Sequence, residues 1–173
     1  MVFVYVIGAA IAAFLGYVAT RPGDFRIQRS LRINATPERI YPHIADFHKW
    51  TAWSPWENID PALTRTYSGA ESGVGAAYAW QGNKKVGEGS MEITKASAPH
   101  DLTIKLDFLK PFEAHNTTQF TLAPSGGATD VTWAMYGPSA FMSKMMGVFF
   151  NMEKFVGGDF EKGLAGLKTV AEA

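Results

Sequence analysis

The chain has 173 residues, of which 47% are hydrophobic, and it carries a formal net charge of zero and no cysteine. This length allows one globular domain with a sizeable core. The balanced charge and the lack of any basic run argue against a nucleic-acid partner. The absence of cysteine excludes disulfides, thiolate metal ligands and cysteine nucleophiles.

The N-terminal segment differs in kind from the rest. Residues 1–20 contain no aspartate, glutamate, lysine, arginine or histidine, and as a helix they would span about 30 Å, the thickness of a bilayer hydrocarbon core. We predict an uncleaved transmembrane anchor at 1–20 and a hinge at 21–23. A cleaved signal peptide is the alternative, but it would normally begin with a basic region.

The predicted anchor has two consequences for location and assembly. Arginines follow the apolar run and none precedes it, so the positive-inside tendency predicts a single-pass membrane protein whose folded domain is cytoplasmic. Gly8, Ala12 and Gly16 are spaced four residues apart, a pattern that lets two membrane helices approach closely. This spacing permits a weak homodimer through the anchor helix.

The folded part begins with an alternating segment. Apolar and polar side chains alternate over residues 25–33, which predicts a half-buried strand. Pro37 suits a first helical turn, and Ile40 and Ile44 lie four residues apart on one helix face. The segment HKWTAWSPW at 48–56 then predicts a second short helix or tight loop.

Six further strands are predicted between about residue 62 and residue 137. Turn residues separate them, and because no helix intervenes the sheet should be antiparallel. The predicted strands are LTRTYSG (63–69), GAAYAWQG (75–82), VGEGSMEITKA (86–96), DLTIKLDFL (101–109), FEAHNTTQFTL (112–122) and TDVTWAMYG (129–137).

The chain ends in a predicted amphipathic helix. Met152, Val156, Phe160, Leu164 and Leu167 follow helical spacing, so their stripe should lie on the sheet. Glycines interrupt this helix at 157, 158, 163 and 166, although each costs up to about 1 kcal/mol relative to alanine. They indicate either close packing on the sheet or a bend that opens a cavity.

The order of these elements resembles the helix-grip fold of the START-like (SRPBCC) superfamily, and in particular the bacterial polyketide cyclase/dehydrase and lipid-transport family. The resemblance covers residues 24–172. It is carried by RSLRINATPERIYPHIADFHKWTAWSPW (29–56), VGEGSMEI (86–93), LDFLKPFEA (106–114), TDVTWAMYG (129–137) and FEKGLAGLKTVAE (160–172).

This resemblance implies an α+β fold with a hydrophobic cavity. A curved seven-stranded antiparallel sheet would wrap around the long C-terminal helix, with two short helices after the first strand and the cavity between sheet and helix. The residues then expected to line the cavity and bind a ligand are Trp53, Trp56, Tyr78, Trp80, Met91, Phe108, Phe112, Asn116, Thr118, Trp133, Met135, Phe149, Met152, Val156 and Phe160.

Three features of this site keep more than one interpretation. Asn116 is either satisfied by the backbone or offers a hydrogen bond to a ligand. Arg29, on the apolar side of the first strand, either extends to the rim or binds a carboxylate. The methionine-rich segment 141–152 is a packed lid, an adaptable mouth for an acyl chain, or a surface that dips into the bilayer.

Evidence for catalysis in the sequence is thin. No zinc-site spacing, nucleophile elbow or phosphate loop occurs, and alternation places Glu88, Glu113 and His115 on the outer face of the sheet. We predict no catalytic residue, metal or cofactor. The predicted function is binding of a hydrophobic small molecule such as a lipid, fatty acid or polyketide-like ring. Alternatives are a cyclase/dehydratase-type enzyme and a protein-interaction module.

Overall fold

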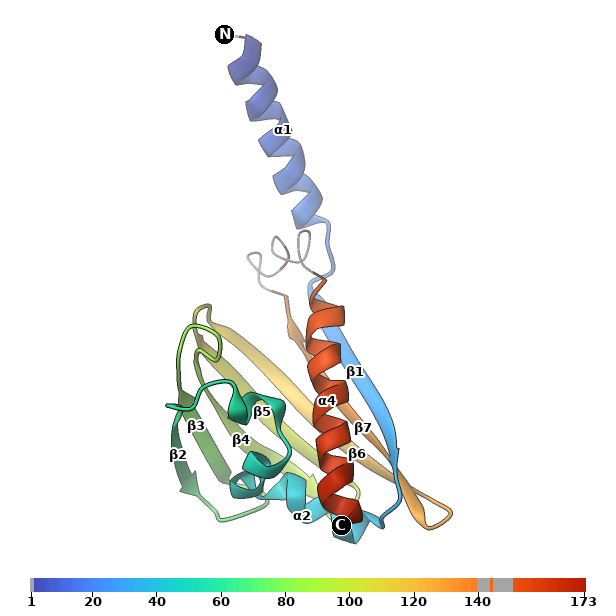
Figure 1. The fold of residues 1–173 in the computed structure, drawn as a ribbon. Coiled ribbons are helices and arrows are strands. Elements are labelled where there is room, and N and C mark those ends of the chain that lie inside the picture. The colour runs from blue at the N-terminus through green and yellow to red at the C-terminus, as the bar shows by residue number, and fades with distance from the viewer. Residues whose placement is uncertain (1, 140–143, 145–150) are drawn as a thin grey trace.

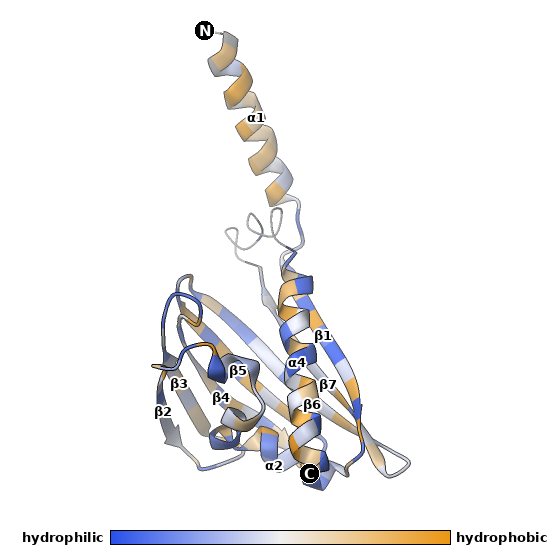
Figure 2. Cartoon of the chain, viewed as in Figure 1, coloured by the Kyte–Doolittle hydropathy of each residue, from blue (hydrophilic) through white to orange (hydrophobic). Residues whose placement is uncertain are grey.

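The computed structural model describes residues 2–139, 144 and 151–173 (Figure 1). At the N-terminus, helix α1 (Val2–Ala19) extends away from the rest of the molecule, and most of its residues are apolar (Figure 2). It has 18 residues and is therefore about 27 Å long. None of the described helices combines the length and the apolar character that crossing a membrane requires.

This finding overturns the predicted transmembrane anchor at residues 1–20. The helix ends at Ala19, short of the roughly 30 Å of a hydrocarbon core, and the Thr20 hydroxyl donates to the Tyr17 carbonyl at 2.7 Å just beyond its end. The predicted single-pass membrane location and the cytoplasmic orientation depend on this anchor, and they are wrong as well. The expected homodimer of anchor helices loses the same basis.

Seven strands form one antiparallel sheet, as the alternation and the short turns predict. They are β1 (Asp24–Ile33), β2 (Thr64–Gly69), β3 (Ala76–Gln81), β4 (Glu88–Ser97), β5 (Asp101–Lys110), β6 (Ala114–Ser125) and β7 (Ala128–Pro138). Their spatial order is β1-β7-β6-β5-β4-β3-β2. The first strand therefore pairs with the last, with Asp24 opposite Pro138 and Ile33 opposite Thr129.

Within the described ranges, three short helices and one long helix complete the fold. Between β1 and β2 lie α2 (Pro37–Ala45) and the 3-10 helices η1 (Phe47–Ala52) and η2 (Pro55–Asn58). Pro55 has no N–H to continue η1, so the chain restarts there as η2. The C-terminal helix α4 (Met152–Glu172) runs along the concave face of the curved sheet (Figure 1). This is the helix-grip arrangement that the resemblance implies.

The main core lies between the C-terminal half of α4, helix α2 and the sheet. Phe47, Trp50 and Trp53 close it from the η1 side. The side chains with the least exposure include Ile33, Ile40, Ile44, Ile93, Leu102, Ile104, Phe120, Leu122, Val131, Leu164 and Leu167.

Two glycines of α4 allow the helix to approach its neighbours closely. A methyl group added to Gly163 would lie 2.6 Å from Cζ3 of Trp133, and one added to Gly166 would lie 2.6 Å from the Trp53 carbonyl oxygen. Nothing lies within 4 Å of the corresponding position at Gly158. Close packing therefore explains Gly163 and Gly166, in agreement with the first of the two alternatives.

Candidate functional site

A cavity of about 290 Å³ lies between the sheet and the N-terminal half of α4. Alternation along β3 to β7 turns one apolar set of side chains toward the helix, and the helix contributes its own apolar stripe from the other side. Glu57 and Asp159 are the only charged side chains among the described residues that line it. The remaining lining is almost wholly apolar and aromatic.

Most residues predicted for the site border this cavity. Trp133 and Met135 come from β7, Thr118 from β6, and Phe108 from β5, which also contributes Leu106. The other predicted residues in the lining are Trp56, Tyr78, Trp80, Met91, Met152, Val156 and Phe160.

Three predicted residues lie elsewhere, and a fourth is outside the described residues. Trp53 belongs to the core and donates its Nε1–H to the His43 carbonyl at 2.9 Å. Phe112 precedes β6, in the turn after β5, and is 58% exposed. Asn116 is buried but outside the lining, and a methyl added to Gly137 would lie 2.6 Å from its Oδ1. Phe149 is the residue outside the described part.

Sequence reasoning missed several lining residues. They are Trp50, Ser54, Glu57, Leu63, Val86, Phe155 and Asp159. Most lie in 3-10 helices or loops, where neither strand nor helix periodicity assigns a face. The signal for Asp159 and Phe155 was available, because both are adjacent on the helix to the predicted apolar stripe.

Glu57 is the centre of a buried polar cluster at the cavity wall. Its Oε1 accepts from the Tyr78 hydroxyl at 2.8 Å, and its Oε2 accepts from Arg65 Nε at 2.6 Å. Arg65 also donates to the Glu57 carbonyl at 2.8 Å. Burial and the hydrogen bond to Glu57 raise the pKa of the Tyr78 phenol well above its ordinary value. The carboxylate is thus occupied on both oxygens, and the phenol stays protonated.

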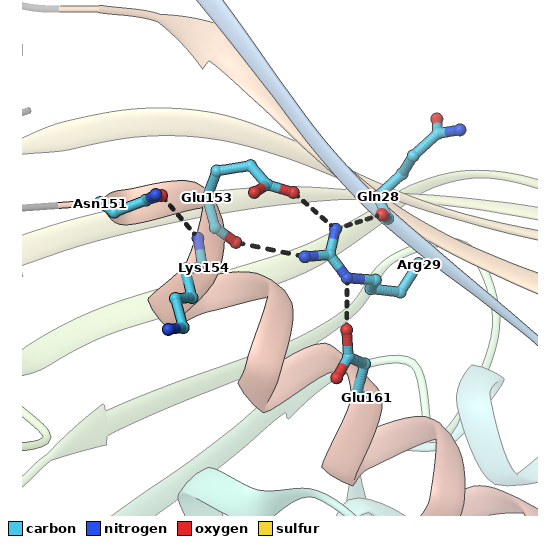
Figure 3. Close-up of polar contacts among 6 residues, drawn as sticks. All are labelled: Gln28, Arg29, Asn151, Glu153, Lys154 and Glu161. Atoms are coloured by element: carbon cyan, nitrogen blue, oxygen red, sulfur yellow. Dashed lines mark hydrogen bonds and ion pairs between the residues drawn. The ribbon is translucent and has the colours of Figure 1, made fainter.

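Arg29 attaches the N-terminal half of α4 to the edge strand β1 (Figure 3). Its Nε lies 2.7 Å from Glu161 Oε1, and its Nη1 lies 2.8 Å from Glu153 Oε1. Gly157 lies directly beneath the guanidinium, where any side chain would collide with it. Of the two interpretations of Arg29, binding a carboxylate is the one observed, and the carboxylates belong to the protein itself.

The candidate acids and bases of the sequence analysis lie away from the cavity. His115 is on the outer face of the sheet, where its Nδ1 lies 2.7 Å from Asp107 Oδ1 and its Nε2 lies 3.2 Å from Glu113 Oε1. The hydrogen bond with Asp107 raises the pKa of the imidazole. Glu88 pairs with Lys110 at 2.7 Å. None of these three predicted residues lines the cavity.

Comparison with known families and structures agrees with this architecture. The model of the family described as "Polyketide cyclase / dehydrase and lipid transport" matches residues 24–172. A search of curated proteins finds no match.

Three solved structures illustrate the fold similarity. Protein CV1439 from Chromobacterium violaceum is 16% identical, with a TM-score of 0.60 over 88% of this chain and 99% of its own. Protein MLL2253 from Mesorhizobium loti is 12% identical, with a TM-score of 0.63 over 86% and 97%. The Aha1 dimer from Colwellia psychrerythraea is 17% identical, with a TM-score of 0.59 over 86% and 96%. At these identities the similarity establishes the fold alone.

Proposed function

Because the chain belongs to the polyketide cyclase/dehydrase and lipid-transport family, we propose that it binds a hydrophobic small molecule, such as a lipid or a polyketide-like ring, in the cavity between the sheet and α4. The observation that carries this proposal is the apolar cavity of about 290 Å³ itself. Ligand sites are typically concave and apolar, with a few placed polar groups.

The cavity volume limits the size of the bound part of the ligand. At about 30 Å³ for each non-hydrogen atom, as for a water molecule in the liquid, 290 Å³ accommodates roughly ten such atoms. An apolar cavity of about half that volume is known to bind benzene. A fused two-ring system, or a short stretch of a longer chain, therefore matches the enclosed space.

The polar groups in the wall favour binding over chemistry. General acid–base catalysis needs a group free to take or give a proton at the substrate. Glu57 already accepts from Tyr78 and Arg65, and Asp159 pairs with Lys162 at 3.2 Å. These carboxylates are held by the protein's own donors, which supports a recognition role.

Native mass spectrometry of the full chain, purified from a lipid-containing host, tests the proposal. We expect an apolar adduct on the wild type and its loss in Val156→Trp, because the indole would occupy the cavity. Lys154→Trp is the matched control, since Lys154 lies on an exposed part of the same helix. A wild-type protein that carries no adduct and takes up no added apolar ligand would contradict the proposal.

A cyclase or dehydratase remains the second candidate, and one observation favours it: a buried carboxylate and a phenol share the cavity wall. The variant Glu57→Gln separates the two functions. A binding protein should yield the same ligand mass from wild type and variant. An enzyme of the dehydratase type should yield a ligand heavier by one water from the variant.

A further inference from the structure

Trp133 carries a buried hydrogen-bond donor without an acceptor among the described residues. Its side chain is 2% exposed and borders the cavity. Three other indoles are satisfied by backbone carbonyls: Trp50 donates to Ile44 at 2.9 Å, Trp53 to His43 at 2.9 Å and Trp80 to Val86 at 3.3 Å. Because an unsatisfied buried N–H costs about 1–3 kcal/mol, the exception at Trp133 needs an explanation.

The contacts of the Trp133 ring show which of its edges faces α4. The benzo edge, at Cζ3, is the part nearest to Gly163 of α4, and one ring face stacks on Phe160 with centroids 4.4 Å apart. The pyrrole edge with Nε1 is at the other side of the indole, away from Gly163. Thr118 and Met135, next to Trp133 on the same sheet face, also border the cavity.

The charges around the cavity restrict which kind of acceptor this N–H can bind. Glu57 and Asp159 line the cavity, and no lysine, arginine or histidine is in the described lining. Residues 140–143 and 145–150 have no charged side chain in the sequence, and Lys144 donates to the Arg21 carbonyl at 3.0 Å. Arg65 and Lys162, the cations paired with Glu57 and Asp159, are outside this lining. An ionised carboxylate in the cavity would therefore lose its water without gaining a cation and would lie near two carboxylates, which is unfavourable in an apolar surrounding.

We propose that the ligand is a neutral hydrophobic molecule with a carbonyl or ether oxygen, which accepts a hydrogen bond from Trp133 Nε1. A carboxylate anion of similar size is rejected. This inference rests on the proposed function and narrows it to a ligand class. The indole supplies a donor and no acceptor, so it selects an acceptor group. Glu57 and Asp159 select against an anion.

Three small molecules of similar size test the proposal by isothermal titration calorimetry with the full chain at neutral pH. Tetralin is apolar, α-tetralone adds a ketone oxygen to the same two rings, and α-naphthoate is an anion. Transfer out of water alone favours tetralin over the ketone. We nevertheless expect α-tetralone to bind about tenfold more tightly than tetralin, and α-naphthoate to bind at least about tenfold more weakly than α-tetralone.

Two variants assign the preference to a residue. Trp133→Phe removes the unpartnered N–H, and the ratio of the two dissociation constants, tetralin over tetralone, should fall to about one. Trp80→Phe is the matched control, because it removes a similar volume from the cavity wall while its N–H is bound to the Val86 carbonyl. In that variant the preference for the ketone should persist.

A spectroscopic readout keeps the test decisive should Trp133→Phe fail to fold. In wild-type protein with labelled indole nitrogens, α-tetralone should move the Trp133 N–H resonance downfield, and tetralin should not. An unmoved resonance, an unchanged ratio in Trp133→Phe, or tightest binding by α-naphthoate would each overturn the inference while binding itself stands. If none of the three molecules binds, the proposed function fails as well.

Discussion

The two halves of α4 lie on the same sheet but pack differently. In the C-terminal half, residues 162–172, Leu164 is 1% exposed and Leu167 is fully buried. In the N-terminal half, residues 152–161, Met152 is 49% exposed and Phe155 is 72% exposed, and several side chains border the cavity. We refer to these as the closed half and the cavity half.

The cavity exists because the two halves of the helix are held in different ways. In the closed half, glycines and tryptophans allow backbone and ring to meet at contact distance, which excludes space. In the cavity half, the helix is held at its side by the ion pairs of Arg29 with Glu153 and Glu161. Ion pairs to the edge strand β1 hold the helix in place and leave the space between the helix and the middle of the sheet unfilled.

The largest expected loss of stability comes from a large-to-small substitution in the closed half. Leu167→Ala should lower the free energy of unfolding by about 2–5 kcal/mol, because the deleted side chain leaves a void in a tightly packed core. Val156→Ala, in the cavity half, should cost less than about 1 kcal/mol, because its side chain already borders empty space. Chemical denaturation of both variants measures the contrast, and equal losses would show that the halves do not differ.

A smaller effect is expected from overpacking the same half. Gly166→Ala places a methyl 2.6 Å from the Trp53 carbonyl oxygen and should destabilise the protein by about 1–3 kcal/mol. Gly158→Ala has free space around it and should stabilise by up to about 1 kcal/mol through helix propensity. Melting temperatures should therefore move in opposite directions, and a gain in both variants would refute close packing at Gly166.

The attachment of the cavity half predicts a local effect. Arg29→Met removes the ion pairs with Glu153 and Glu161, so amide hydrogen exchange in the first turns of α4 should become faster while the closed half keeps its protection. Arg39→Met, an exposed change on α2, should leave both halves unchanged. Unaltered exchange at the start of α4 in Arg29→Met would show that other contacts hold this half.

The smallest effect concerns protonation of His43, which lies beside the closed half. Burial, with Lys49 and Arg39 nearby, lowers the pKa of His43, so the unfolded chain binds more protons as pH falls. Its contribution to stability is therefore lost on acidification below its unfolded pKa of about 6.5. NMR titration should place His43 below about 6.5 and His115, whose pKa Asp107 raises, above it.

The outcome for a His43→Gln variant follows from the same sign. As the pH falls from ~7.5 to ~5.5, the variant should become more stable relative to wild type, because glutamine binds no proton in either the folded or the unfolded chain. Equal pH dependence of wild type and variant in denaturation experiments would contradict the lowered pKa.

The sequence predicts the sheet side of the site well because strand alternation assigns each residue to a face. Tyr78, Phe108, Thr118, Trp133 and Met135 all reach the cavity for this reason. The turns and the helical spacing of the C-terminal apolar stripe also follow from local residue chemistry. These features depend on neighbours in sequence, so a single chain is enough to predict them.

Other parts depend on tertiary contacts that the sequence pattern does not contain. The alternation places Phe112 in a strand, but that strand begins two residues later, at Ala114, and Phe112 lies in the preceding turn. Glu57 reaches the cavity from a four-residue 3-10 helix, which has no periodicity to read. Apolar composition predicts the position of the N-terminal helix, found at Val2–Ala19, but the membrane-spanning role that this composition suggests is wrong.

The pairing of the first strand with the last has a consequence for how the protein is made. Residues 24–33 emerge from the ribosome early, yet their partner strand spans 128–138, and Glu153 and Glu161, the ion-pair partners of Arg29, follow later still. Such distant contacts form slowly and only once the intervening chain exists. The cavity is therefore complete only after residues 152–160 of α4 have been made, and β1 stays unpaired until residues 128–138 exist.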